Sequence, residues 1–276
     1  YAMFMGIDIG QGYDDLFLNM KRLVIIFTIL TFFATGCTSF KQRPDEPSSR
    51  KTSPEAEALF NKLQKQNSQL QSFKGTGRIR MQNENGIQRA RIIWAGYKNE
   101  KFRLEIMGPS GQPTLSFTYD GSRIYLISHT ESRFYSKRSS NASLEKMISL
   151  PIGVNEALDL LAGRIPIGIY CSPILLGKEQ EDEQVLVLKR PGRNRGYDNI
   201  TVATAADVIR QIESFANDGS LNYRAKIISM QKISGFRVPK ELQFSGEGQV
   251  SLQIVVERFW PNAPVSESLF VLTKPE

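Results

Sequence analysis

The chain contains few of the side chains that build disulfide frameworks, metal centres and nucleophilic active sites. Its 276 residues include two cysteines, Cys37 and Cys171, and a single histidine, His129. Small secreted domains rely on several disulfide bridges, and a metal site needs clustered His, Cys, Asp or Glu ligands. A Ser/His/Asp or Cys/His arrangement would depend on His129, which stands in "ISHTES" where two strands are expected to meet in a turn. We interpret His129 as a solvated turn residue and expect no disulfide framework, metal, cofactor or enzymatic activity.

The apolar run near the N-terminus is too short to cross a bilayer. "LVIIFTILTFFA", Leu23 to Ala34, holds twelve residues, whereas a membrane-spanning helix needs about 20. Lys21 and Arg22 precede it, as a positive segment precedes the apolar part of a secretory signal. We therefore assign residues 1–36 to an upstream extension followed by a signal peptide, Met20 to Gly36, and exclude them from the fold.

Small residues lead from this run to Cys37 in "ATGC". The pattern resembles the bacterial lipobox, in which the signal is cut before the cysteine and its thiol carries diacylglycerol. The resemblance implies a diacylglycerol and a fatty acid at Cys37, and an anchored protein of the bacterial envelope. Thr38 follows, and not the aspartate that resembles an inner-membrane retention signal. The alternative is an ordinary secretory signal with an incidental cysteine.

The residues after Cys37 divide into a tether and one domain. "TSFKQRPDEPSSRKTSP" is polar and rich in Pro and Ser, a composition that buries too little apolar surface to order itself. We expect a flexible tether over 37–52 and a single domain over 53–276. Ser53 as N-cap, Pro54 in the first turn and apolar residues at helical spacing predict a helix from about Pro54 to Leu70.

From Lys74 onward the apolar residues alternate with polar ones. The runs are broken by Asn85-Gly86, Asp120-Gly121 and Asp218-Gly219, which are typical of tight hairpin turns. Two short helical patterns, "ASLEKMISL" and "GVNEALDLLAG", interrupt the series. We count about eleven strands and three helices, which predicts a mainly β fold: a single bent antiparallel sheet, an incomplete half-barrel, with helices lidding an apolar cavity.

Two segments carry a family resemblance. "FRLEIMGPSGQPTLSFTYDGSRIYLI", Phe102 to Ile127, resembles the strand, Gly/Pro loop, strand and Asp-Gly turn of the LolB-type outer-membrane lipoprotein receptors and the related LolA-type carriers. "EALDLLAGRIP", Glu156 to Pro166, is similar to a helix and its exit in the same family.

The resemblance implies a non-enzymatic receptor. It would take the acyl chains of lipoproteins from a periplasmic LolA-type carrier and release them into the outer membrane, from the inner leaflet and facing the periplasm. We expect a monomer. A structural or sensing lipoprotein with the same fold is the alternative; a lipid-acting hydrolase would need a nucleophile beside a base.

Apolar residues of the first strands are the candidates for lining the cavity, although each could instead pack a filled core. These are Trp94, Phe102, Leu104, Ile106, Leu115, Phe117 and Tyr119. The resemblance further implies a membrane-contact loop, "MGPSGQP", whose tip in the family is apolar. Here the tip is Ser110, so Met107, Pro109 and Pro113 are left to touch lipid.

The distribution of charge along the sequence suggests one further contact segment. The 35 basic and 28 acidic side chains give a net charge of +7, which favours acidic partners or anionic lipid heads. "KRPGRNRG", Lys189 to Gly196, could meet lipid phosphates or an acidic partner, or be a charged loop. "EQEDEQ", Glu179 to Gln184, reads as a solvated hairpin end and not as a calcium site, because it lacks Gly-punctuated spacing. We expect no nucleic-acid partner.

Overall fold

The computed structural model describes residues 53–274 except 85, 99, 167, 178–181, 193–194, 206 and 248–249. These residues belong to one compact unit, Pro47–Glu276. The expected signal peptide, Cys37 and the tether lie outside the described residues, and their assignment stays a prediction.

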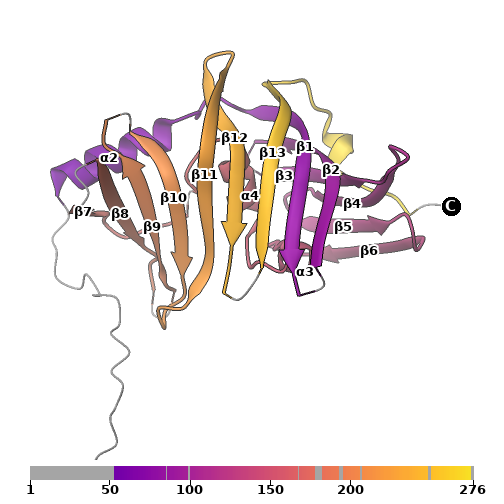
Figure 1. Cartoon of the computed structure of the whole chain (residues 1–276), viewed down its shortest axis with the longest axis horizontal. Coiled ribbons are helices and arrows are strands. Elements are labelled where there is room, and N and C mark those ends of the chain that lie inside the picture. Colours follow the sequence, from indigo (N-terminus) through magenta and orange to yellow (C-terminus); the bar gives the residue numbers. More distant parts are fainter. Residues whose placement is uncertain are drawn as a thin grey trace, which may run out of the picture. The chain divides into compact units, whose positions relative to one another are not determined.

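The unit is built on one antiparallel sheet (Figure 1). The order of its thirteen strands is β6-β5-β4-β3-β2-β1-β13-β12-β11-β10-β9-β8-β7. Two meanders, β1 to β6 and β7 to β13, are joined where β1 pairs with β13, and the sheet does not close into a barrel. The strands are β1 Ser72–Asn83, β2 Gly86–Tyr97, β3 Lys101–Met107, β4 Pro113–Tyr119, β5 Arg123–Ser128, β6 Arg133–Arg138, β7 Ile174–Gly177, β8 Glu183–Lys189, β9 Tyr197–Ala203, β10 Val208–Phe215, β11 Leu221–Ile233, β12 Phe236–Ser245 and β13 Ser251–Pro261.

The predicted fold class, a bent and open antiparallel sheet with helices against one face, is confirmed. The strand count was two too low, because β7 and β9 were missed. β7 has only four residues. β9 carries the buried carboxylate of Asp198 on the same side as Ile200 and Val202, which breaks the polar and apolar alternation that a sequence pattern detects.

In the described residues, three helices and a short 3-10 turn accompany the sheet: α2 Pro54–Lys65, α3 Glu145–Ile148, α4 Val154–Leu161 and η2 Glu267–Phe270. Ser53 caps α2 by accepting from the amide of Ala56 at 3.1 Å, as expected. The expected extension of α2 to Leu70 is wrong. Asn67 has a left-handed backbone (φ 54°), and its side-chain amide donates to the carbonyls of Ala162 and Arg237. These bonds hold the chain out of the helical path.

The core lies between the helices and the face of the sheet that they cover, which we call the inner face. Six of the eight residues of α4 are buried, and α4 passes behind the middle strands in Figure 1. A side chain at Gly96 on β2 would lie 2.7 Å from the Leu158 side chain and 2.6 Å from the Phe73 ring. The absence of a side chain there lets α4 approach the sheet closely.

The C-terminal segment covers part of the opposite, outer face. Phe270 in η2 is fully buried and stacks on Tyr97 with ring centroids 6.4 Å apart, and Arg103 on β3 donates to the carbonyl of Leu269 at 2.8 Å. Across the described residues, no helix has the length and apolarity that a bilayer crossing requires.

Candidate functional site

A small apolar cavity of about 40 Å³ lies between the inner face and the helices. Ligand pockets usually measure about 300–1,000 Å³, so this cavity is too small to hold an acyl chain as it stands. Three of the sequence-derived candidates line it, together with residues of and around α3 and α4: Trp94, Phe102, Leu104, Leu144, Ile148, Ile152 and Leu161.

Trp94 forms part of the cavity wall because two glycines opposite it make room for the indole. A side chain at Gly75 would lie 2.2 Å from the ring, and one at Gly77 would lie 3.2 Å from it. Both glycines occupy inner-face positions of β1, next to β2. The indole Nε1 is buried and has no hydrogen-bond partner among the described residues, so this apolar wall holds one unpaired donor.

A second pocket, of about 230 Å³, lies next to the cavity over β4 to β6. Its apolar wall consists of Phe117, Ile124, Leu126 and Met147, and lysines at its rim include Lys137. The rings of Phe102, in the cavity wall, and Phe117, in the pocket wall, are 6.3 Å apart. The two hollows are therefore neighbours along the inner face.

Helix α3 separates these hollows. Leu144 and Ile148 face the cavity, whereas Met147 lines the pocket. The helix has four residues, its N-cap Leu144 makes no side-chain cap bond, and Ser149 at its end is left-handed (φ 55°). One uncapped turn has little stability of its own, so its displacement would join the cavity and the pocket at modest cost.

The other three candidates share the inner face but line neither hollow. Tyr119 is buried and donates from its hydroxyl to the carbonyl of Gly121 at 2.8 Å. Ile106 packs against the core, and Leu115 lies opposite it on β4, half-buried.

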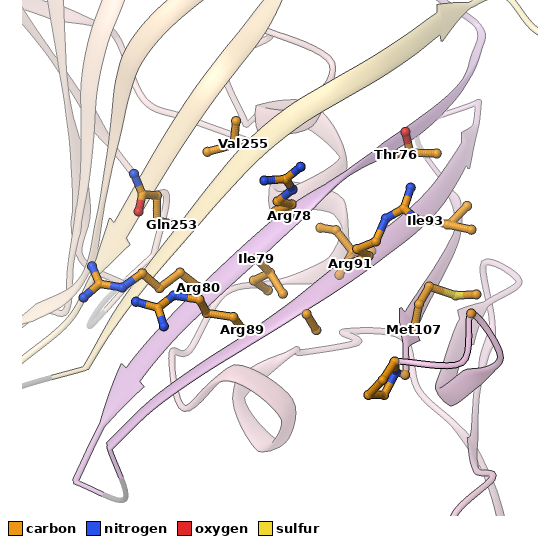
Figure 2. A pocket seen from close by; sticks show the side chains of 15 residues that line it. Thr76, Arg78, Ile79, Arg80, Arg89, Arg91, Ile93, Met107, Gln253 and Val255 are labelled. Carbon is orange, nitrogen blue, oxygen red and sulfur yellow. The ribbon is translucent and has the colours of Figure 1, made fainter.

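The loop between β3 and β4 turns sharply at its glycines. The amide of Gly108 donates to the carbonyl of Gln112 at 2.8 Å, and Gly111 takes a positive φ of 78°. Ser110 at the tip is exposed, and Pro113 begins β4. Met107 and Pro109 line a groove of about 750 Å³ on the outer face (Figure 2).

A partly buried polar cluster beside α4 was missed by sequence reasoning. Arg190 donates to Asp198 at 2.6 Å and to Ser214 at 2.8 Å, and the Tyr170 hydroxyl donates to Asp198 at 3.0 Å. Arg190 also lies 4.0 Å from Glu156. The charged segment that begins at Lys189 therefore uses one arginine inside the fold; only the inward carboxylate on β9 could have signalled this.

Burial controls the ionisation of this cluster. It raises the pKa of Asp198 above its ordinary value despite the opposing charge of Arg190, and it raises the pKa of Glu156 despite a hydrogen bond from the Gly153 amide. Burial and the neighbouring Asp198 also raise the pKa of Tyr170. Glu156, Tyr170 and Arg190 line a pocket of about 270 Å³. The cluster resists full charging of its carboxylates.

His129 is exposed, as expected, but it is not merely solvated. Its Nε2 lies 2.9 Å from the hydroxyl of Ser116, and that hydroxyl lies 3.4 Å from Glu105. In a catalytic triad the carboxylate orients the imidazole, which in turn contacts the serine. Here the serine stands between the two, Glu105 is paired with Arg103, and Ser116 is only 2 % exposed. The arrangement lacks triad geometry.

Metal ligands are not gathered anywhere in the described part of the chain: no group of three or more His, Cys, Asp or Glu side chains there could hold a metal ion. Cys171 is exposed and forms no disulfide there. The residues 178–181, which hold part of the acidic run, lie outside the described residues.

Solved structures with the same architecture identify the fold. A domain named for outer membrane lipoprotein sorting, from Vibrio parahaemolyticus, aligns with a TM-score of 0.57 at 11% identity and covers 78% of this chain and 97% of its own. A LolA superfamily protein from Nitrosomonas europaea aligns with a TM-score of 0.58 at 15% identity, over 81% of this chain and 99% of its own.

The chain has the LolA/LolB-type fold. A DUF1329 family protein from Desulfovibrio piger is also similar, with a TM-score of 0.60 at 11% identity, over 79% of this chain and 96% of its own. Neither the scan against protein-family models nor the search of curated proteins found a match. The family resemblance in Phe102 to Ile127 and Glu156 to Pro166 is thus confirmed at the level of fold.

Proposed function

We propose that this LolA/LolB-type protein is a lipid-anchored envelope protein that binds acyl chains of lipoproteins between the inner face of its sheet and its helices, and helps to deliver them to the outer membrane. It acts as a binding protein and not as an enzyme. The observation that carries the proposal is the pair of neighbouring apolar hollows at Phe102 and Phe117, separated by the single turn of α3.

The cavity is small, so binding requires α3 to move. Each methylene group buried in an apolar site contributes about 0.8 kcal/mol, and several of them offset the loss of contacts made by Leu144 and Ile148. The unpaired Nε1 of Trp94 is a donor available to an ester or amide carbonyl of the ligand.

Membrane attachment belongs to the same proposal. A lipid-modified Cys37 would hold the domain at the periplasmic face of the outer membrane, where a carrier of the same fold could bring cargo. The names of the similar proteins from Vibrio and Nitrosomonas support this role, because one is named for lipoprotein sorting and the other for the LolA superfamily.

Trp94 provides the test, because the sequence has two tryptophans and the other, Trp260, is 43% exposed while Trp94 is 1% exposed. In the compact unit carrying Trp260→Phe, a brominated fatty acid should quench Trp94 fluorescence by direct contact, at micromolar concentrations. Leu104→Phe, which fills the cavity, should prevent the quenching. Ile93→Phe, on the outer face of β2, should leave the quenching unchanged.

A structural or sensing lipoprotein remains the second candidate, favoured by the nearly filled interior. Under that role the acyl probe leaves Trp94 fluorescence unchanged in the parent and in both variants. The same absence of quenching would overturn the acyl-binding proposal.

A further inference from the structure

The groove on the outer face is lined by four arginines on two neighbouring strands. Arg78 and Arg80 lie on β1, and Arg89 and Arg91 lie on β2 (Figure 2). In the register of the two strands Arg78 is directly opposite Arg91, and Arg80 is directly opposite Arg89. Like charges placed opposite each other destabilise a sheet, so the folded protein holds these two pairs against their mutual repulsion.

One carboxylate offsets part of this charge. Glu257 on β13 lies 2.7 Å from Arg78 and 3.8 Å from Arg91. Both arginine side chains are still about three-quarters exposed, at 75% and 73%. Arg80 and Arg89 are exposed and have no carboxylate partner among the described residues. Arg80 faces the amide side chain of Gln253 across to β13. The end of the groove nearest the turn between β1 and β2 therefore has two adjacent guanidinium groups whose N–H donors are available to a ligand.

Apolar side chains border the same groove. Ile93 on β2 is 39% exposed, Pro109 at the loop is exposed, and Met107 lies directly opposite Arg91. Guanidinium groups beside exposed apolar side chains match the boundary of a bilayer, where phosphates and the upper acyl region lie within one side-chain length. An acidic protein segment would match the arginines, but it would give no reason for the exposed Ile93 and Pro109.

We propose that this outer groove binds the phosphates of anionic phospholipids at a bilayer surface, with Arg80 and Arg89 as the principal contacts and the loop Met107 to Pro113 beside them at the bilayer boundary. This surface is separate from the inner face and its acyl-binding hollows, and the inference does not depend on them. Guanidinium groups bind phosphate oxygens through paired hydrogen bonds. Docking would orient the domain with its outer face, at the end of β1 and β2, toward the membrane.

The experiment uses the full chain reconstituted into vesicles, so that every variant has the same N-terminal segment. A solvatochromic amino acid replaces Ser110 in the loop, and in a second preparation it replaces Ile228, which is 47% exposed on β11. Vesicles contain phosphatidylcholine alone or with increasing phosphatidylglycerol. The probe at 110 should shift to the blue only with phosphatidylglycerol, and the shift should fade with added salt. The probe at 228 should not shift.

Arg80→Gln/Arg89→Gln should lower the docking equilibrium by about fivefold for each arginine removed, and these exposed changes relieve repulsion, so the variant should fold. The matched control is Arg210→Gln/Lys226→Gln, two exposed basic residues on β10 and β11, which removes the same charge and should leave the shift intact. Inorganic phosphate at the same ionic strength should not reverse the shift.

Three results would overturn the inference. An equal shift with phosphatidylcholine alone would mean insertion of the loop without phosphate binding. Reversal by inorganic phosphate would indicate a site for a small free anion. The absence of a shift with every vesicle would mean that the groove does not bind a bilayer, and would favour an acidic protein segment as its partner. Quenching of Trp94 by the acyl probe is unaffected by all three, so failure here and failure of the acyl-binding proposal are separable.

Discussion

Arg164 and Asp159 form an ion pair inside the protein, with Nε and Oδ1 3.0 Å apart and side chains only 4% and 7% exposed. The pair joins α4 to the segment that follows it, and Arg164 also donates to the carbonyl of Leu70, just before β1, at 3.1 Å. Burial lowers the pKa of Arg164, although the charge of Asp159 opposes this. The exit of α4, "LAGRIP", is thus held to the segment before β1 by charge as well as by apolar packing.

Removing the arginine should be costly. Arg164→Met leaves Asp159 as a buried carboxylate without its guanidinium partner, and the free energy of unfolding should fall by about 3–5 kcal/mol. Urea denaturation measures this. The double variant Arg164→Met/Asp159→Leu should recover most of the loss, because it removes both charges.

An exposed pair serves as the control. Arg133 and Glu131 are 3.3 Å apart with side chains 81% and 60% exposed, and Arg133→Met should change the free energy of unfolding by less than about 1 kcal/mol. Equal losses for Arg164→Met and Arg133→Met would show that the buried pair has no special role.

Glu156 should make stability depend on pH. Its folded-state pKa is raised by burial, so the folded protein binds the proton more tightly than the unfolded chain does. The free energy of unfolding should therefore fall as pH rises from about 4.3, the ordinary glutamate value, through the folded-state pKa. Glu156→Gln, which keeps an acceptor for the Gly153 amide, should flatten this decline. Part of the decline should remain in this variant, because the pKa of Asp198 is also raised.

Urea denaturation of both proteins at several pH values between 4 and 7 checks this. Glu131→Gln, an exposed carboxylate near β6, is the control and should keep the slope of the parent protein. A Glu156→Gln variant with the parent's slope would mean that Glu156 titrates as it does in the unfolded chain.

Cys37 should determine membrane attachment. A protein that carries two or more fatty acyl groups attaches stably to a bilayer, whereas a protein that carries one binds only marginally. Cys37→Ser should therefore abolish palmitate labelling and leave the chain uncleaved or in the soluble fraction. Cys171→Ser, which changes the other, exposed cysteine, should label and fractionate as the parent does. Palmitate labelling that survives Cys37→Ser would refute the lipobox assignment.

The fold could be predicted from sequence where a local pattern determines the structure. Alternation in Lys101–Met107 predicts β3 and its two faces, Asp120-Gly121 predicts the turn between β4 and β5, and Ser53 predicts the start of α2. The end of α2 could not be predicted, because it depends on bonds from Asn67 to residues about 95 and 170 positions away.

The candidate site was only partly accessible to sequence reasoning. Residues of one face, such as Phe102 and Phe117, follow from alternation, but the cavity volume depends on how Trp94 fits over Gly75 and Gly77 from the neighbouring strand. The outer groove depends on register: Arg80 and Arg89 are ordinary surface residues in the sequence and become a cluster only because the β1–β2 hairpin places them opposite each other.

The loop between β3 and β4 should set the rate of delivery if the protein releases cargo into membranes. Ser110 at its exposed tip gains almost nothing from entering lipid, whereas Met107 beside it is half-buried in the outer groove. Ser110→Leu should speed the appearance of labelled lipoprotein in liposomes from a carrier complex, because a leucine side chain gains about 1.5–3 kcal/mol on full burial in an apolar phase.

Met107→Asp should slow the same transfer, because a carboxylate is unfavourable in the bilayer interior and is repelled by anionic head groups. Thr204→Leu, at the exposed turn between β9 and β10, and Ile228→Asp, at an exposed position on β11, are the matched controls and should not alter the rate. A rate that responds to neither loop substitution would show that the loop is only a connection between strands, and that release uses another surface of the domain.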